Sequence, residues 1–282
     1  MAEFRFDRRD VEFVLFEQMK LGELCGLGTY KDQDAESYAG ILGAAYDLAK
    51  ERLWPINAES DRVGARFDGG AVSVPECQKA FRKLFVENGF LAMSNSVEWG
   101  GLGLPILLSA ACGEIFIGAC LTFTLTPMLT RGAAHIVEVH GTEWMKKLYL
   151  ERMYSGEWSG TMCLTEPQAG SDLAAVRTRA KRDGEGFLIE GTKIFITSGE
   201  HDFTKQIVHT VLARIEGAPA GIKGISLFLV PKYVPNPDGS LGEFNDVVCG
   251  NIEHKMGINA SPTCTLNFGG SGTCRGWLIG QE

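Results

Sequence analysis

The residues whose types and spacing best suit ligand binding or chemistry lie in one stretch, Met162 to Asp172, which reads MCLTEPQAGSD. Thr165 offers a hydroxyl and a backbone N–H at the end of an apolar strand, and Pro167 and Gly170 then turn the chain. Such a turn leaves N–H groups and hydroxyls pointing into a cleft, where they suit an anion or a flat polar ring. From spacing alone, a tight loop between two domains is the simpler interpretation.

A second stretch, residues 191–199, reads GTKIFITSG and places the aromatic Phe195 two residues before the hydroxyl of Thr197. An aromatic and a threonine on a strand are ordinarily a buried ring and a surface hydroxyl, so this pattern alone predicts no site. Glu166 and Asp172 carry carboxylates, but carboxylates in turns usually accept hydrogen bonds from neighbouring N–H groups. We therefore nominate neither as a catalytic base.

Metal and nucleotide sites are not predicted. Residues 199–202 (GEHD) have metal-ligand types, but no second cluster at ligand spacing accompanies them, so a loop is the better interpretation. The chain shows no hydrolase elbow, no P-loop and no dinucleotide glycine fingerprint. The eight cysteines have no CxxC spacing and are interpreted as small buried hydrophobic residues.

The sequence predicts helices in the first half of the chain and strands in the second half, and these elements must position the residues described above. Apolar side chains recur at helical spacing in the first half, with Asp34 as an N-cap, a capping box from Ser73 to Glu76, and residues 64–70 as a polar link. This pattern predicts an all-α domain of six helices, near residues 11–19, 34–49, 73–89, 106–118, 126–140 and 142–152.

The periodicity changes to two from about Gly160, and residues 183–186 (DGEG) predict a hairpin turn. Helices followed by strands argue against a doubly wound sheet and favour an α+β chain of two domains, residues 1–157 all-α and residues 158–282 a β-barrel or sandwich. The strands are expected near residues 176–181, 187–189, 193–197, 207–215, 225–230, 263–268 and 277–279.

Composition narrows the classes of protein. The chain has 282 residues, 45% of them hydrophobic, and a net charge of −8, which weighs against nucleic-acid binding as the main function. No apolar signal core begins the sequence, and the most apolar run, residues 104–121, is interrupted by Ser109, Gly113 and Glu114. We expect a soluble, cytoplasmic protein without a membrane span.

These stretches together resemble the acyl-CoA dehydrogenase family of flavoproteins. Residues 163–166 (CLTE), residues 169–172 (AGSD) and Ala175 match a signature of that family position by position. Residues 98–105 (EWGGLGLP) and residues 253–257 (EHKMG) resemble further family segments. The amino-acid sequence of residues 192–196 and 199–202 is most similar to that of the subgroup that includes 3-methylmercaptopropionyl-CoA dehydrogenase.

The resemblance implies FAD-dependent α,β-dehydrogenation of an acyl-CoA thioester, with an electron-transfer flavoprotein as electron acceptor. Thr197 is implied as a donor toward flavin N5 and Phe195 as the aromatic packed near the ring; most relatives have Trp there, and Phe lacks the indole donor. Ser171 and Gly170 are implied for acyl-CoA binding, and no residue is implied as catalytic. The implied flavin contacts are Met162, Leu164, Thr165, Phe195, Ile196 and Thr197.

One departure from the family is large. In the family a third, all-helical domain follows the β domain, brings the catalytic glutamate in most members and builds the homo-oligomer. This sequence stops at Glu282, so the resemblance predicts a chain without that domain: a designed fragment, a product of proteolysis or a shortened gene. A non-catalytic binding or scaffold module that keeps the family shape is the alternative.

Overall fold

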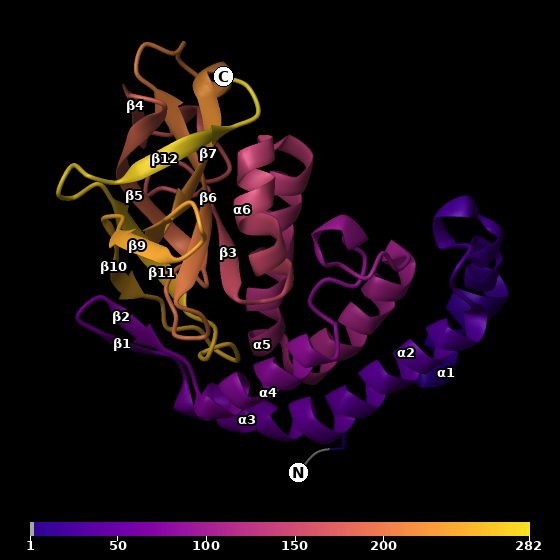
Figure 1. Ribbon diagram of the computed structural model, residues 1–282. Helices are drawn as coiled ribbons and strands as arrows, with labels where there is room; N and C mark the ends of the chain where they lie inside the picture. The colour runs from indigo at the N-terminus through magenta and orange to yellow at the C-terminus, as the bar shows by residue number, and fades with distance from the viewer. Residues whose placement is uncertain (1–2) are drawn as a thin grey trace.

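The computed structural model describes residues 3–282, and it shows a helical half followed by a β domain (Figure 1). The helices are α1 (Arg8–Glu12), α2 (Ala35–Leu48), α3 (Trp54–Val63), α4 (Glu76–Glu87), α5 (Ile106–His140) and α6 (Glu143–Tyr154). The strands are β1 (Arg66–Asp68), β2 (Ala71–Ser73), β3 (Trp158–Cys163), β4 (Arg179–Asp183), β5 (Gly186–Thr197), β6 (Gln206–Ile215), β7 (Ile225–Pro231), β8 (Tyr233–Pro235), β9 (Leu241–Phe244), β10 (Val247–Ile252), β11 (Thr263–Phe268) and β12 (Arg275–Ile279).

Capping residues predict two helix starts, and one of these predictions is wrong. Asp34 caps α2 as expected, because its Oδ1 accepts from the backbone N–H of Ser37 at 2.7 Å. The capping box at Ser73 does not form: Ser73 ends strand β2, and α4 begins at Glu76 with Pro75 at its N-cap and no side-chain cap. Pairing of Ser73 with Arg66 across the hairpin holds it in the strand instead.

Helix α5 replaces two predicted helices. The break lies at Cys120, which has extended backbone angles (φ −159°, ψ 92°), and Pro127 lies inside the second arm instead of starting it. Arg131 Nη1 donates to Ser109 Oγ at 3.0 Å, although each residue lies eleven positions from Cys120, about 16 Å of helix. The two arms of α5 therefore fold back against each other.

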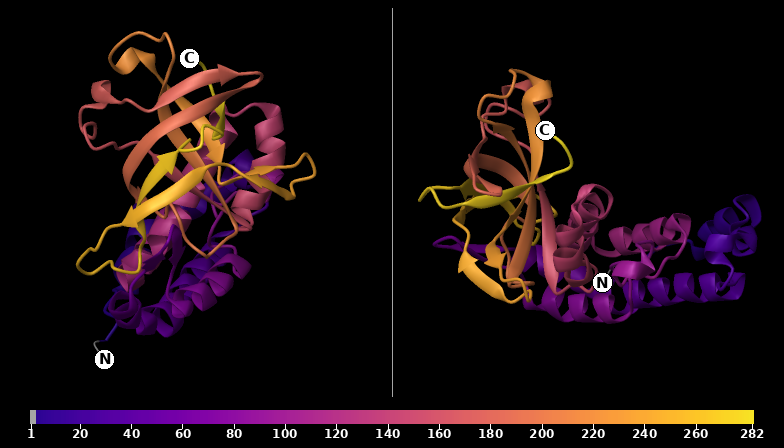
Figure 2. Two further views of the ribbon diagram at one scale, coloured as in Figure 1. Left: turned by 90° about the vertical axis from the view of Figure 1, so that its left-hand side faces the viewer. Right: turned by 45° about the horizontal axis from the view of Figure 1, so that its top comes forward.

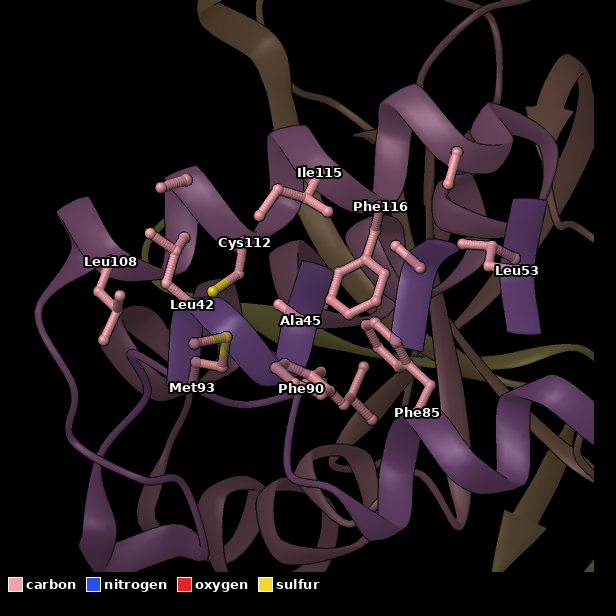
Figure 3. Packing of buried hydrophobic residues seen from close by; sticks show 14 of the residues in the cluster. Leu42, Ala45, Leu53, Phe85, Phe90, Met93, Leu108, Cys112, Ile115 and Phe116 are labelled. Atoms are coloured by element: carbon pink, nitrogen blue, oxygen red, sulfur yellow. The ribbon is translucent and has the colours of Figure 1, made fainter. Parts of the chain in front are cut away.

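By length and composition α5 would suffice to cross a membrane, but 56% of its most apolar window is buried inside the structure. Its apolar side chains instead build the core of the helical half. Figure 3 shows Phe116 of α5 beside Phe85 and Phe90, with ring centroids 5.1 and 4.9 Å away. The buried, almost uniformly apolar helix that the sequence predicts at residues 106–118 is thus the first arm of α5.

The prediction of a polar link at residues 64–70 is wrong, because this segment forms the first strand and the turn of the β1–β2 hairpin. The hairpin leaves the helical half and packs on the β domain (Figure 1), where Val72 joins the buried β core. The helical half therefore contains two short strands. Sequence periodicity could not show this, because only one residue of the hairpin, Val72, is buried.

The β domain is a closed barrel with extensions, as the period-two pattern predicts. The sheet order is β10-β11-β5-β12-β7-β6-β3, and β4 pairs with both β5 and β6, so β5, β12, β7, β6 and β4 close a ring (Figure 2). Most pairs are antiparallel, but β3 and β4 both run parallel to β6. The predicted hairpin at residues 183–186 joins β4 to β5.

A third buried cluster joins the two halves. Tyr149 and Met153 of α6 pack with Trp158 of β3, and α6 stands beside β3 in Figure 1. Gly160 sits where a Cβ would lie only 2.8 Å from Ala133 of α5, so a larger residue would force the halves apart. This close contact aligns β3 with the second arm of α5.

Candidate functional site

The two stretches that the sequence singles out, residues 162–172 and residues 191–199, lie side by side. After β3 ends, the chain runs along β5, where the N–H of Ile194 donates to the carbonyl of Thr165 at 2.8 Å. Lys193 Nζ donates to the carbonyl of Leu164 at 3.0 Å. These contacts place Thr165 next to the segment that contains Phe195; that the two segments line one ligand site stays a prediction.

Glu166 is the centre of a buried polar network behind this site. It accepts from Lys193 Nζ at 2.8 Å, from Thr178 Oγ1 at 2.6 Å, from the N–H groups of Arg177 and Thr178, and from Gln168. Burial by itself raises the pKa of Glu166, but Lys193, Thr178 and the backbone donors outweigh it and lower the pKa to about 2. A carboxylate so engaged is a poor proton acceptor, in agreement with the structural role that the sequence indicates.

A bulge in β5 turns Phe195 outward. Lys193 lies opposite Leu266 and Ile196 opposite Cys264, so β5 spends three steps where β11 spends two. Phe195 takes the left-handed φ of +58°, and its side chain is 57% exposed. Left-handed backbone in a bulky residue is costly and is concentrated at functional sites. The ring is therefore accessible at this strand end.

Ile196 and Ser198 point away from that surface. The side chain of Ile196 is 2% exposed and belongs to the β core, so only its backbone can reach a ligand. Ser198, also at positive φ (+54°), has its Oγ 2.6 Å from Thr126 Oγ1 of α5. The side chain of Ile196 therefore drops out of the predicted ligand contacts, whereas those of its neighbours Phe195 and Thr197 remain.

The two threonine hydroxyls of the site are available to a ligand. Within residues 3–282, neither Thr165 nor Thr197 has a side-chain hydrogen-bond partner, and both are half-buried. Met162 and Leu164 are half-buried as well. Two free hydroxyls beside an exposed aromatic ring fit a flat ring with polar edges, such as the isoalloxazine of FAD.

Gly170 and Ser171 lie exposed in the turn that follows Glu166. The turn is held by paired backbone hydrogen bonds between Glu166 and Ala169, at 2.8 and 3.0 Å. Asp172 accepts from the N–H of Ala174 and caps a short 3₁₀ turn, as expected for a carboxylate in a turn. The Ser171 hydroxyl has no protein partner within the described chain, so it too is open to a ligand.

The loop at residues 199–202 uses all its polar side chains within the protein. Glu200 pairs with Lys232 at 2.7 Å, and His201 Nε2 lies 2.9 Å from Ser159 Oγ. Asp202 accepts from the N–H of Val74 and from Lys79 of the helical half. Among residues 3–282, no three His, Cys, Asp or Glu side chains gather in a way that could hold a metal ion.

Sequence reasoning missed two residues that build the site. Lys193, whose side chain is fully buried, ties the turn to β5, and Ser198 ties β5 to α5. Lys193 shares the alternation of Phe187 and Ile189, which points inward, and this phase was the available signal. No local signal marks Ser198, because its partner Thr126 is 72 residues away.

Comparison with known proteins gives a consistent result. The family model "Acyl-CoA dehydrogenase, N-terminal domain" matches residues 36–157, and "Acyl-CoA dehydrogenase, middle domain" matches residues 161–270. The 3-methylmercaptopropionyl-CoA dehydrogenase of Ruegeria pomeroyi is 39% identical over 97% of this chain and 46% of its own length. A butyryl-CoA dehydrogenase of Syntrophomonas wolfei is 37% identical over 99% and 46%. The chain spans about half the length of these relatives.

Solved structures agree on the fold. The acyl-CoA dehydrogenase of Bacillus anthracis, complexed with FAD, superimposes with a TM-score of 0.69 at 26% identity, over 89% of this chain and 39% of that one. A chain from the structure of the electron transferring flavoprotein of Acidaminococcus fermentans gives a TM-score of 0.69 at 28% identity, over 89% and 59%.

Proposed function

The chain belongs to the acyl-CoA dehydrogenase family, whose N-terminal and middle domains it carries, and from this premise we propose that it serves FAD-dependent α,β-dehydrogenation of an acyl-CoA thioester. The observation that carries the proposal is the strand end at Phe195, an exposed ring on a bulge with Thr197 and Thr165 nearby, whose hydroxyls have no partner among residues 3–282. We place the division between the two domains at residues 157 and 158.

The described residues would hold FAD by one edge and one face. Thr165 and Thr197 would donate to the polar edge of the isoalloxazine, Phe195 would pack against it, and Met162 and Leu164 would line the apolar part. Hydride acceptance from the β-carbon is the chemistry that FAD supplies when bound. Fixed donors stabilise the negative charge that the ring gains, and the Glu166–Lys193 network holds them in place.

The remaining parts of the proposal concern substrate and partners. Gly170 and Ser171, open in the turn beside Thr165, would contact the acyl-CoA. An electron-transfer flavoprotein would take the electrons in the cytoplasm, and the whole protein would be a homo-oligomer. We nominate no catalytic base, because Glu166 is enclosed by donors and Asp172 caps a turn.

The test of the flavin site is Thr197→Val in the whole protein. The change keeps the β-branched shape and deletes one donor, whose bond to a charged ring contributes roughly 1.5–3 kcal/mol. We expect slower flavin reduction and a lower flavin potential, with thermal stability preserved. Thr263→Val is the control, because Thr263 of β11 pairs with Thr197 of β5 and the same change deletes an equivalent hydroxyl from the neighbouring strand. Unchanged reduction kinetics and potential would refute the assignment.

A second test uses the polypeptide of residues 1–282 alone. With part of the FAD pocket and no nominated base, it should bind FAD weakly and give no turnover with acyl-CoAs and an artificial electron acceptor. Turnover of order 1 per second or faster would show that these residues form a complete active site. A scaffold or binding module, the competing function, predicts no FAD binding and no flavin absorbance even in the whole protein.

A further inference from the structure

Arg131 differs from the other cations inside the protein. Among residues 3–282, every other lysine or arginine that is buried or half-buried donates to a carboxylate or a carbonyl oxygen. Lys232, for example, pairs with Glu200, and Arg214 donates to two loop carbonyls. In the described part of the chain, the half-buried Arg131 has one partner, the neutral hydroxyl of Ser109 at 3.0 Å. Its remaining N–H donors have no acceptor among residues 3–282.

A small apolar cavity lies beside Arg131, between the two arms of α5 and the end of α4. Its volume is about 60 Å³, room for a few heavy atoms. Arg131 and Ser109 line one part of it. Figure 3 shows apolar side chains of the remaining wall: Phe85, Phe90, Met93, Cys112 and Phe116. The cavity therefore combines an apolar interior with a cationic, hydrogen-bonding edge.

This combination matches one chemical class. A guanidinium withdrawn from water is destabilising unless an anion or acceptors compensate it, and burial lowers the pKa of Arg131 accordingly. The planar guanidinium accepts a carboxylate in a two-point contact, and aromatic and sulfur walls suit a short alkyl chain. We propose that Arg131 and Ser109 bind the carboxylate of a short aliphatic acid, whose alkyl chain fills the cavity.

The cavity lies close to the candidate flavin surface. Thr124 of the second α5 arm lines it, and Thr126 of the same arm contacts Ser198, the neighbour of Thr197. Arg131 follows Thr126 by five residues, about 7.5 Å along a helix. The carboxylate therefore has two sources: a free acid, or the far end of an acyl group bound at that surface. The second source rests on the proposed function, and the first does not.

The experiment measures binding of butyrate to the full chain by calorimetric titration, with butyramide as the uncharged isostere. We expect saturable binding of butyrate and at least tenfold weaker binding of butyramide. Arg131→Gln and Ser109→Ala should weaken butyrate binding, Arg131→Gln by tenfold or more, and Arg131→Lys should fall between. Arg52→Gln, which removes the same charge from an exposed position, should leave binding unchanged. Circular dichroism confirms that each variant is folded.

Absence of saturable butyrate binding overturns the proposal, and so does equal binding of butyramide or undiminished binding by folded Arg131→Gln and Ser109→Ala. Displacement by succinyl-CoA but not by butyryl-CoA would identify the far carboxylate of an acyl group as the source. Butyrate binding that neither thioester displaces would identify the free acid. Because no arm requires FAD or turnover, failure of the dehydrogenase proposal leaves this test intact.

Discussion

Two ion pairs of this protein use the same kinds of charge in opposite surroundings. Lys193 and Glu166 meet at 2.8 Å beneath the candidate site, with side chains 0% and 3% exposed. Lys79 and Asp202 meet at 2.6 Å where the helical half touches the β domain, with side chains 26% and 39% exposed. The first pair is enclosed by further donors, and the second also has water within reach.

The degree of burial determines which of the two ion pairs stabilises the fold. In the buried pair, both side chains are withdrawn from water and have further hydrogen bonds only to neutral groups, so loss of either partner leaves an uncompensated charge in the core. In the exposed pair, water and salt replace a lost partner, and the pair contributes little. Geometry alone does not separate the two, because their N···O distances are similar. Burial decides which one holds the turn at Thr165 in place.

Lys193→Met should show the largest effect. It leaves Glu166 buried without its cation, which costs about 3–5 kcal/mol of unfolding free energy. Urea-induced unfolding of the variant and the parent measures this. The double variant Lys193→Met, Glu166→Gln should recover part of the loss, because no charge is then left unpaired. A single variant within about 1 kcal/mol of the parent would show that water reaches the pair.

Acid should weaken the buried pair next. The pKa of Glu166 is lowered from 4.5 to about 2 in the folded protein, so its contribution is fully present above pH 4.5 and is lost as the pH falls toward 2. Urea titrations between pH 6 and pH 2.5 should show this decline, and Glu166→Gln should show a smaller one. Equal pH dependence in the two proteins would place the acid sensitivity elsewhere.

Phe195→Gly should stabilise the protein by about 1 kcal/mol. Phe195 is exposed and takes a left-handed φ that glycine adopts without steric cost, so little packing is lost and strain is relieved. The same change at Phe244, an exposed strand residue whose φ is not positive, should destabilise by roughly 0.5–1 kcal/mol. Thermal melts compare the two. Destabilisation of both to the same extent would mean that the Phe195 ring contributes packing.

Lys79→Ala should show the smallest effect, about 0–1 kcal/mol, decreasing further in 0.5 M salt. Lys83→Ala is the matched control, because the pair that Lys83 forms with Glu87, at 3.8 Å, lies within α4. If Lys79→Ala lowers the unfolding free energy by about 2 kcal/mol or more beyond the control, the exposed pair between the helical half and the β domain stabilises the protein far more than its exposure predicts.

Local patterns of the sequence predict much of this site. The motif that contains Thr165 and the segment with Phe195 and Thr197 stand out through their residue types and their resemblance to family segments, and the backbone contact of Thr165 with β5 joins them. The role of Glu166 as an acceptor from neighbouring N–H groups also follows from its place in a turn. Binding of FAD by these residues stays a prediction.

Local sequence patterns were enough to predict a helical half before a β domain, the cap at Asp34, the turn at residues 183–186 and the period-two alternation of β5, because each depends on residues a few positions apart. Local patterns could not predict the break at Cys120, the β1–β2 hairpin on the barrel, the parallel pairing of β3 with β6 or the bulge that exposes Phe195. Those features depend on contacts between distant segments. A local pattern reports which face of an element is apolar, but not which partner will cover it.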